Sequence, residues 1–191
     1  NVGIALGIDH GEGVGKEAAI LLAYELGGDF PKIWILDEYI NTKRTDPDED
    51  AAAILKMLRR HDINPEEIDL AVGDINTAGK GGGGIKVNDA IHRQTKKRHP
   101  PIVIQSARKG RGSVMYGNRL INYAFRRGDL TVHPRARSLI HSLRHWKGAN
   151  DDLKHTLDAA RYIIAQILSH KKGYYRLRFG IEADMGNFYV R

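Results

Sequence analysis

The chain of 191 residues contains no cysteine, and its aromatic content is only 7%. The missing cysteines exclude disulfide bonds and thiolate metal sites, so any metal ion must be held by oxygen donors or histidine. No apolar run approaches the ~20 residues that a membrane-spanning helix needs. The first residues also lack the basic start and the small-residue cleavage site of a signal peptide. We therefore expect a soluble globular protein with no membrane partner.

The sequence shows no internal repeat and no linker rich in proline and serine. Its length and its hydrophobic content of 41% suit one domain with a sizeable core. We expect the core to span about residues 2–170. A basic tail at 173–191 would follow, either as an edge strand or partly disordered. Because a strand begins almost at Asn1, we also expect the chain to be a domain excised from a longer protein.

The charges are distributed unevenly along the chain. Residues 1–95 carry 10 Lys and Arg against 17 Asp and Glu, which gives −7. Residues 96–191 carry 20 against 6, which gives +14, so the whole chain has a net charge of +7. A strongly basic half indicates a polyanionic partner, with nucleic acid first. The alternative is a solvated basic face that only aids solubility.

Alternating apolar runs and turns predict a mixed α/β fold. Strands are expected at about 2–9, 16–24, 33–39, 68–73, 102–105 and 130–132. Helices are expected at about 45–61, 85–97, 113–127, 135–146 and 154–170. Short turns join the first three strands, which predicts an antiparallel meander.

The stretch from Ile4 to Gly13 organises the prediction of function. Its apolar residues have no helical spacing and lead into Asp9, which is followed by a glycine-rich turn. A single strand-end aspartate more often caps its own turn. Here the pattern recurs at Asp74, after the strand at 68–73, and Asp158 on the last long helix supplies a third acid. If the first and fourth strands are neighbours, these carboxylates can meet.

Three clustered carboxylates repel one another and do not all stay ionised unless a cation neutralises them. Oxygen donors without cysteine favour Mg²⁺ or Mn²⁺ over zinc. Two such ions about 4 Å apart can hold an attacking water and stabilise the leaving oxygen of a phosphodiester. The basic half would then bind the DNA backbone on either side of the cut.

Four segments together resemble the nuclease domain of tailed-phage terminase large subunits, which belong to the ribonuclease H-like superfamily. They are Gly7-Ile8-Asp9-His10-Gly11-Glu12-Gly13, Asp37-Glu38-Tyr39, Gly73-Asp74 and the late helix segment His155–Tyr162. The most specific piece is the pattern Lys-His-x-x-Asp-Ala-x-Arg-Tyr on that helix. The resemblance covers roughly Val2 to Leu168.

The resemblance implies a central mixed sheet of five or more strands, in the order 3-2-1-4-5, with helices on both faces. It implies metal-dependent cleavage of concatemeric double-stranded viral DNA during genome packaging, in the host cytoplasm at the procapsid. By position, Asp9, Asp74 and Asp158 match the family's three metal-binding acids. The implied partners of a full-length protein are an ATPase motor domain, the small terminase subunit and the portal.

Further candidates have weaker support. Some family members carry another acid shortly after the first aspartate, and Glu12 is the nearest carboxylate here. His155 shares a helix face with Asp158 and could steer water or contact the phosphate. Glu38 ends the third strand, which two other strands should separate from the fourth. The candidates for DNA contact are basic residues on loops: Lys80, Arg108, Lys109 and Arg111.

Other functions fit the sequence less well. The segment Gly11–Glu17 looks like a phosphate-binding P-loop, which has four residues between its first glycine and its Gly-Lys pair. Here only three residues separate Gly11 from the Gly-Lys pair, and Glu17 replaces the hydroxyl residue that should follow the lysine. The other histidines show no zinc spacing. A Holliday-junction resolvase would share the metal chemistry and differ in substrate. A sugar-kinase or actin-like ATPase needs a far longer chain, and a catalytically silent DNA-binding module is the remaining alternative.

Overall fold

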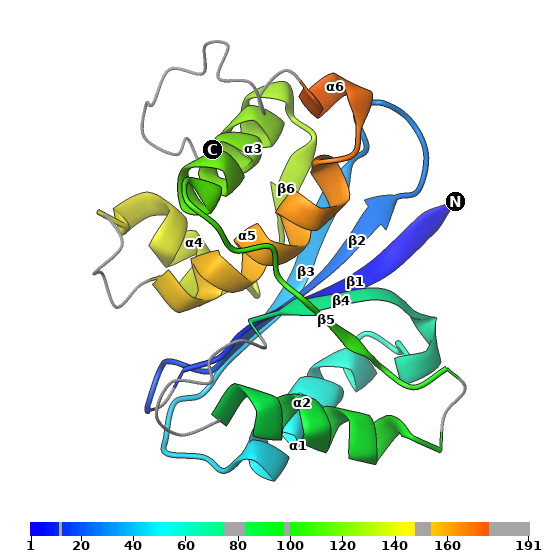
Figure 1. Cartoon of the computed structure of the whole chain (residues 1–191), viewed down its shortest axis with the longest axis vertical. Helices are drawn as coiled ribbons and strands as arrows, with labels where there is room; N and C mark the ends of the chain where they lie inside the picture. Colours follow the sequence, from blue (N-terminus) through cyan, green and yellow to red (C-terminus); the bar gives the residue numbers. More distant parts are fainter. Residues whose placement is uncertain (12, 75–82, 98–99, 148–153, 176–191) are drawn as a thin grey trace.

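The computed structural model describes residues 1–11, 13–74, 83–97, 100–147 and 154–175. Its centre is a six-stranded mixed sheet in the order β5-β4-β1-β2-β3-β6, with helices on both faces (Figure 1). The predicted α/β class is confirmed. The predicted order 3-2-1-4-5 is present, and β6 extends the sheet beyond β3.

The element bounds lie within a few residues of the predicted ones. The strands are β1 (Val2–Asp9), β2 (Ala18–Glu25), β3 (Ile33–Ile40), β4 (Ile68–Gly73), β5 (Ile104–Ser106) and β6 (Leu130–Val132). The helices are α1 (Pro47–Arg59), the 3-10 turn η1 (Pro65–Glu67), α2 (Gly83–Thr95), α3 (Ser113–Arg127), α4 (Arg137–His145), α5 (Lys154–Leu168) and α6 (Lys172–Tyr175).

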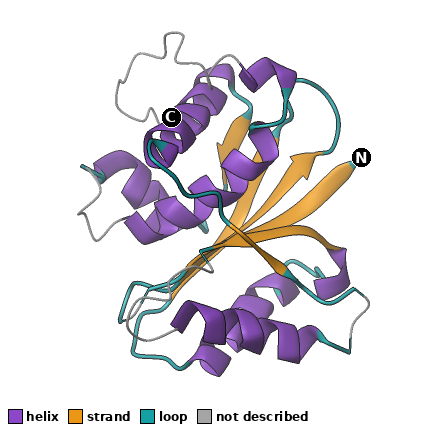
Figure 2. Cartoon of the chain, viewed as in Figure 1, coloured by secondary structure: helices purple, strands orange, loops and turns teal. Residues whose placement is uncertain are grey.

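The three long strands β1, β2 and β3 form the predicted antiparallel meander. β4 pairs in parallel with β1, β5 pairs in parallel with β4, and β6 pairs in parallel with β3. Alternate residues of the central strands face opposite sides, so the sheet separates two apolar clusters. Ile8 belongs to the cluster beneath α1 and α2, whereas Ala5 belongs to the cluster beneath α3, α4 and α5. Figure 2 shows these two helical layers on either side of the sheet.

Local sequence explains where α1 begins. Asp46 accepts a hydrogen bond from the backbone of Glu49, whose side chain accepts one from Asp46 in return, and Pro47 follows the cap. This reciprocal cap satisfies two backbone donors that the helix leaves unpaired. None of the helices in the described part of the chain has the length and apolar character needed to cross a bilayer.

Helix α5 lies directly against β1 because Gly7 has no side chain. A Cβ atom at Gly7 would lie 2.2 Å from the carbonyl oxygen of Ala159 and 2.7 Å from a methyl carbon of Ile163. The glycine therefore permits a close approach of helix and strand. This approach sets the position of the first turns of α5 over the C-terminal end of β1.

The first residues of the predicted tail do not form an edge strand. Gly173 and Tyr174 belong to the short helix α6, and Tyr174 is fully buried. Its ring packs edge-on against Tyr123 at 5.5 Å, and its hydroxyl donates to Asp129. Burial of this one aromatic ring explains why the chain turns back onto the domain here. Residues 176–191 lie outside the described residues.

Candidate active site

Two of the predicted acids lie at the ends of neighbouring parallel strands. Ile8 pairs with Gly73 in the β1–β4 ladder, so Asp9 and Asp74 are the next residues along the two strands. Adjacent strands are about 4.8 Å apart. Asp9 lies two residues beyond Gly7 and Asp74 two beyond Val72, and both of these residues face α5. Both aspartates are almost fully buried, with 5% and 4% of their surface exposed.

Helix α5 brings His155 and Asp158 to the same end of the sheet. The Nδ1 atom of His155 lies 2.8 Å from Oδ2 of Asp9, within a buried contact. Because an ionised carboxylate only accepts hydrogen bonds, the imidazole is the donor. Asp158 lies one turn further along α5 and is close enough for its charge to act on Asp9.

Tyr162, one turn after Asp158 on α5, is near enough to all three acids to feel their charges. Burial raises the pKa of its hydroxyl, and the negative charges of Asp9, Asp158 and Asp74 raise it further. All three carboxylates therefore act on one phenol group. The structure thus brings the three predicted acids together on one side of the sheet.

Each carboxylate of the site has a nitrogen donor beside it. The ammonium group of Lys109 binds Asp74 and lies 5.4 Å from the centre of the Tyr162 ring. The guanidinium of Arg161 donates to Asp158 over 2.7 Å, and His155 donates to Asp9. These partners offset the repulsion that three neighbouring carboxylates would otherwise produce.

Burial dominates the protonation of Asp9. Loss of hydration raises the pKa of its carboxyl group above the ordinary value, and the charge of Asp158 raises it further. Hydrogen bonds from His155 and from the Tyr162 hydroxyl act in the opposite direction. A cation placed beside Asp9 would favour the ionised form in the same way as these donors.

The donor set has the chemistry of a site for a hard divalent cation. Asp9, Asp74 and Asp158 supply carboxylate oxygens, the ligands that Mg²⁺ and Mn²⁺ prefer. Among the residues that the structure describes, no three Asp, Glu or His side chains are grouped so that they could hold a metal ion as they stand. Lys109 and Arg161 each contact one carboxylate oxygen, of Asp74 and Asp158 respectively, so a cation bound at these acids would compete with the two contacts.

A second buried pair lies on the opposite side of β1. His10 contacts Oε1 of Glu17 over 2.8 Å and Oδ1 of Asn88 on α2 over 3.0 Å. Burial alone would lower the pKa of His10, but the bonds to Glu17 and Asn88 and the nearby carboxylates raise it. The pair ties α2 to the residue that follows Asp9, and so holds the end of β1 in place from behind.

The remaining predicted candidates lie elsewhere. Glu38 accepts hydrogen bonds from the backbone of Ser138 and Leu139 and so caps the start of α4. It is separated from β1 by β2. Arg108 and Arg111 are exposed and line a pocket between α3 and α5. Glu12 and Lys80 lie outside the described residues.

Sequence reasoning assigned no role to Tyr162 or Arg161 and treated Lys109 only as a possible DNA contact. The first two were within reach of inference, because Arg161 and Tyr162 lie three and four residues after Asp158 and therefore share its helix face. The Lys109 contact depends on how the loop after β5 folds back onto β4. No local pattern in the sequence signals that arrangement.

No protein-family model matches the chain, and no curated protein matches it. Among solved structures, it is similar to the nuclease domain of the P22 large terminase, with 15% identity, coverage of 93% of this chain and 87% of that one, and a TM-score of 0.59. It is also similar to the human cytomegalovirus terminase nuclease domain, Mn soaked and inhibitor bound, with 11% identity, coverage of 92% and 86%, and a TM-score of 0.50. The nuclease domain of the bacteriophage SPP1 large terminase, with bound Mn, gives 17% identity, coverage of 86% of each chain and a TM-score of 0.48.

At these levels of identity, the likeness to the P22 and cytomegalovirus domains establishes the fold. The chain has the ribonuclease H-like fold of terminase nuclease domains, as the sequence resemblance implied. Function must be argued from the site itself.

Proposed function

We propose that this chain is an endonuclease that uses divalent metal ions to hydrolyse phosphodiester bonds of double-stranded DNA. The observation that carries the proposal is the placement of Asp9 and Asp74 at the C-terminal ends of two neighbouring parallel strands, with Asp158 of α5 close enough to act on Asp9. The fold shared with the P22 and cytomegalovirus terminase nuclease domains supports it, as does the manganese soaked into the latter. We further propose packaging of viral DNA as the setting.

The three acids would hold Mg²⁺ or Mn²⁺, as two ions. When bound, such ions supply Lewis acidity at the scissile phosphate and stabilise the leaving oxygen. His155 orients the Asp9 carboxylate by donating its Nδ1 hydrogen. Lys109 and Arg161, once released from Asp74 and Asp158, are placed to bind the phosphates next to the one that is cut.

Basic residues flank the site on two sides and suit a DNA backbone. On one side, Lys16, Arg137 and His141 line a hollow that reaches His155. On the other, Arg108 and Arg111 line the pocket between α3 and α5. Cations on both sides of the carboxylates allow one strand to pass over the site with its phosphates neutralised.

A plasmid-nicking assay tests the proposal. The chain is incubated with supercoiled plasmid in Mn²⁺, in Mg²⁺ and in excess chelator. We expect nicked and linear products with either metal and none with chelator. Asp9→Asn should abolish cleavage while duplex binding, measured without metal, is unchanged or stronger, because one negative charge is lost next to the phosphate.

Asp48→Asn is the matched control, since Asp48 is an exposed aspartate on α1 that pairs with Arg93 at the surface. It should cleave as the wild type does. Near-normal cleavage by Asp9→Asn, or no cleavage by the wild type in either metal, would exclude the nuclease. A strong preference for four-way junctions over plasmid would instead assign the site to a junction resolvase.

In a full-length packaging protein, we propose that this domain works with an ATPase motor domain, a small terminase subunit and a portal, in the host cytoplasm at the procapsid. Co-purification of a longer native chain with portal rings would support this setting.

A further inference from the structure

A groove between α3 and α5 continues directly from the candidate active site. It encloses about 470 Å³, within the range of about 300 to 1,000 Å³ that is typical of ligand pockets. Lys109, Arg161 and Tyr162 line both the groove and the site. Whatever occupies the groove would therefore adjoin the reacting phosphate.

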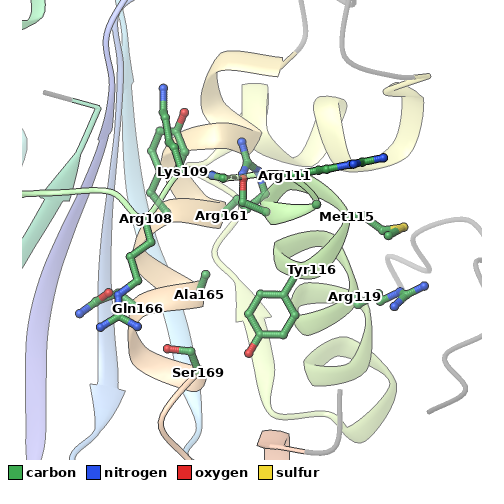
Figure 3. Close-up of a pocket in the computed structure, with 14 residues that line it drawn as sticks. Arg108, Lys109, Arg111, Met115, Tyr116, Arg119, Arg161, Ala165, Gln166 and Ser169 are labelled. Atoms are coloured by element: carbon green, nitrogen blue, oxygen red, sulfur yellow. Dashed lines mark hydrogen bonds between the residues drawn. The ribbon is translucent and has the colours of Figure 1, made fainter. Parts of the chain in front are cut away.

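The groove has a basic end and an aromatic end. Figure 3 shows Lys109 and Arg161 near one end, the side chain of Arg108 reaching along α5 to Gln166, and the ring of Tyr116 projecting from α3 into the space beside Ala165 and Ser169 of α5. Arg161 and Ala165 are one helical turn apart, or about 6 Å along the axis. This distance suits a phosphate at the basic end and its attached base at the aromatic end.

One polar group that lines the groove has no partner within the described part of the protein. The hydroxyl of Ser169 is buried without a hydrogen bond from any described residue. Buried polar groups normally find partners because leaving them unpaired costs about 1 to 3 kcal/mol. The groove thus presents hydrogen-bonding groups as well as an aromatic ring to a ligand.

We propose that this groove binds one unpaired nucleotide of the DNA strand being cleaved. The phosphate lies between Lys109 and Arg161, and the base stacks on Tyr116 and meets the polar groups of Arg108, Gln166 and Ser169. The proposal rests on the proposed function for the identity of the ligand. It adds that the site acts on locally opened DNA, because a base within a duplex cannot reach Tyr116.

Fluorescence anisotropy without divalent metal tests this, since cleavage then cannot interfere. Two labelled duplexes of equal length and charge are compared, one fully paired and one with a few central mismatches. The wild type should bind the mismatched duplex about tenfold more tightly. Tyr116→Leu should reduce this preference to less than about twofold, whereas Tyr116→Phe, which keeps the ring, should retain it.

Ala165→Leu is a second variant, which fills the space beside Tyr116 and should also abolish the preference. Arg126→Gln is the matched control, because Arg126 is an exposed cation of α3 outside the groove. Equal binding of both duplexes by the wild type, or an unchanged preference in folded Tyr116→Leu, would overturn the proposal. Metal-dependent cleavage without a preference for the mismatched duplex would overturn nucleotide binding in the groove and leave the nuclease proposal standing. The preference without any cleavage would overturn the nuclease proposal alone.

Discussion

At the scale of single residues, the Asp9 carboxylate depends most on what surrounds it. Burial and the charge of Asp158 favour its neutral form, whereas the donors His155 and Tyr162 favour the ionised form that can bind a cation. His155 is itself buried, so its bond to Asp9 is shielded from water. The imidazole is therefore a positioning residue for the carboxylate.

His155→Ala should impair metal use more than DNA binding. Loss of the Nδ1 donor leaves Asp9 buried with less support for its charge and free to rotate. Removing such a partner of a metal ligand typically lowers metal affinity or activity by about 10 to 100-fold. We expect the Mn²⁺ concentration for half-maximal nicking to rise within that range, while metal-free duplex binding stays the same.

His155→Asn provides the sharper comparison, because its amide nitrogen can occupy nearly the same place as Nδ1 and should restore most activity. His170→Ala, at an exposed histidine beyond α5, is the neutral control. If His155→Ala needed no more Mn²⁺ than the wild type for half-maximal nicking, the contact between His155 and Asp9 would not contribute to metal use.

Part of the candidate site could be predicted from the sequence. Asp9 and Asp74 follow apolar strands and could be named from the sequence, because strand ends are readable from periodicity. Glu38 lies near the end of β3 in the same way, yet it caps α4. The difference lies in strand order and in which helix start lies opposite each strand end. Neither property is encoded within the few residues around Glu38.

At the scale of elements, the contact between α5 and β1 fixes the site. His155, Asp158 and Tyr162 all lie on α5, whereas Asp9 lies at the end of β1. The position of three site residues relative to the fourth therefore depends on how closely this helix approaches this strand. Gly7 controls that distance.

Gly7→Ala should disturb both stability and the site. The new methyl group would lie 2.2 Å from a backbone oxygen of α5, which cannot move unless the helix moves. Overpacking of this kind costs about 1 to 3 kcal/mol. We expect a lower free energy of unfolding in urea, and a loss of nicking activity that persists under conditions where the variant is fully folded.

Gly27→Ala is the control, since a Cβ atom there meets nothing within 4 Å. It should leave both stability and nicking unchanged. Full activity of folded Gly7→Ala would show that the site tolerates displacement of α5.

The sequence predicted most elements to within a few residues because their signals are local. The acids and proline at the start of α1 and the glycine and basic residues at the end of α3 mark helix boundaries. The tail at Gly173–Tyr174 was misjudged because its helix depends on the burial of Tyr174 against Tyr123, a contact across about 50 residues of sequence. The pairing of β6 with β3 is equally non-local.

At the scale of the whole molecule, Asp129 joins three distant parts of the chain. It accepts hydrogen bonds from Lys32 before β3, from Arg127 at the end of α3 and from Tyr174 in α6. Burial alone would raise the pKa of Asp129, but these donors lower it below its ordinary value of 3.8. The ionised carboxylate therefore stabilises the fold above that pH.

Asp129→Asn should destabilise the protein in a pH-dependent way. Because the pKa is lower in the folded than in the unfolded state, the stabilisation is complete above pH 3.8 and is lost as the pH falls through the folded-state pKa. The cations are partly exposed, so we expect the free energy of unfolding to fall by about 1 to 2 kcal/mol near pH 7.

Urea unfolding of the wild type and the variant at several pH values checks this. The difference between their free energies of unfolding should shrink only below the ordinary pKa. A difference that did not change with pH would mean that the charge of Asp129 is unimportant.

The division of charge between the two halves of the chain predicts how DNA binding responds to salt. The basic half supplies Arg108 and Arg111 beside the site, and each phosphate contact contributes about 0.9 to the slope of log affinity against log salt. The double variant Arg108→Gln/Arg111→Gln should therefore reduce that slope by about 2, measured by anisotropy on a fully paired duplex without metal. The pair Arg59→Gln/Arg126→Gln removes the same charge from exposed positions on α1 and α3 that line neither the groove nor the hollow, and it should change the slope little. Equal changes in the two double variants would mean that net charge, rather than a basic surface beside Asp9 and Asp74, drives binding.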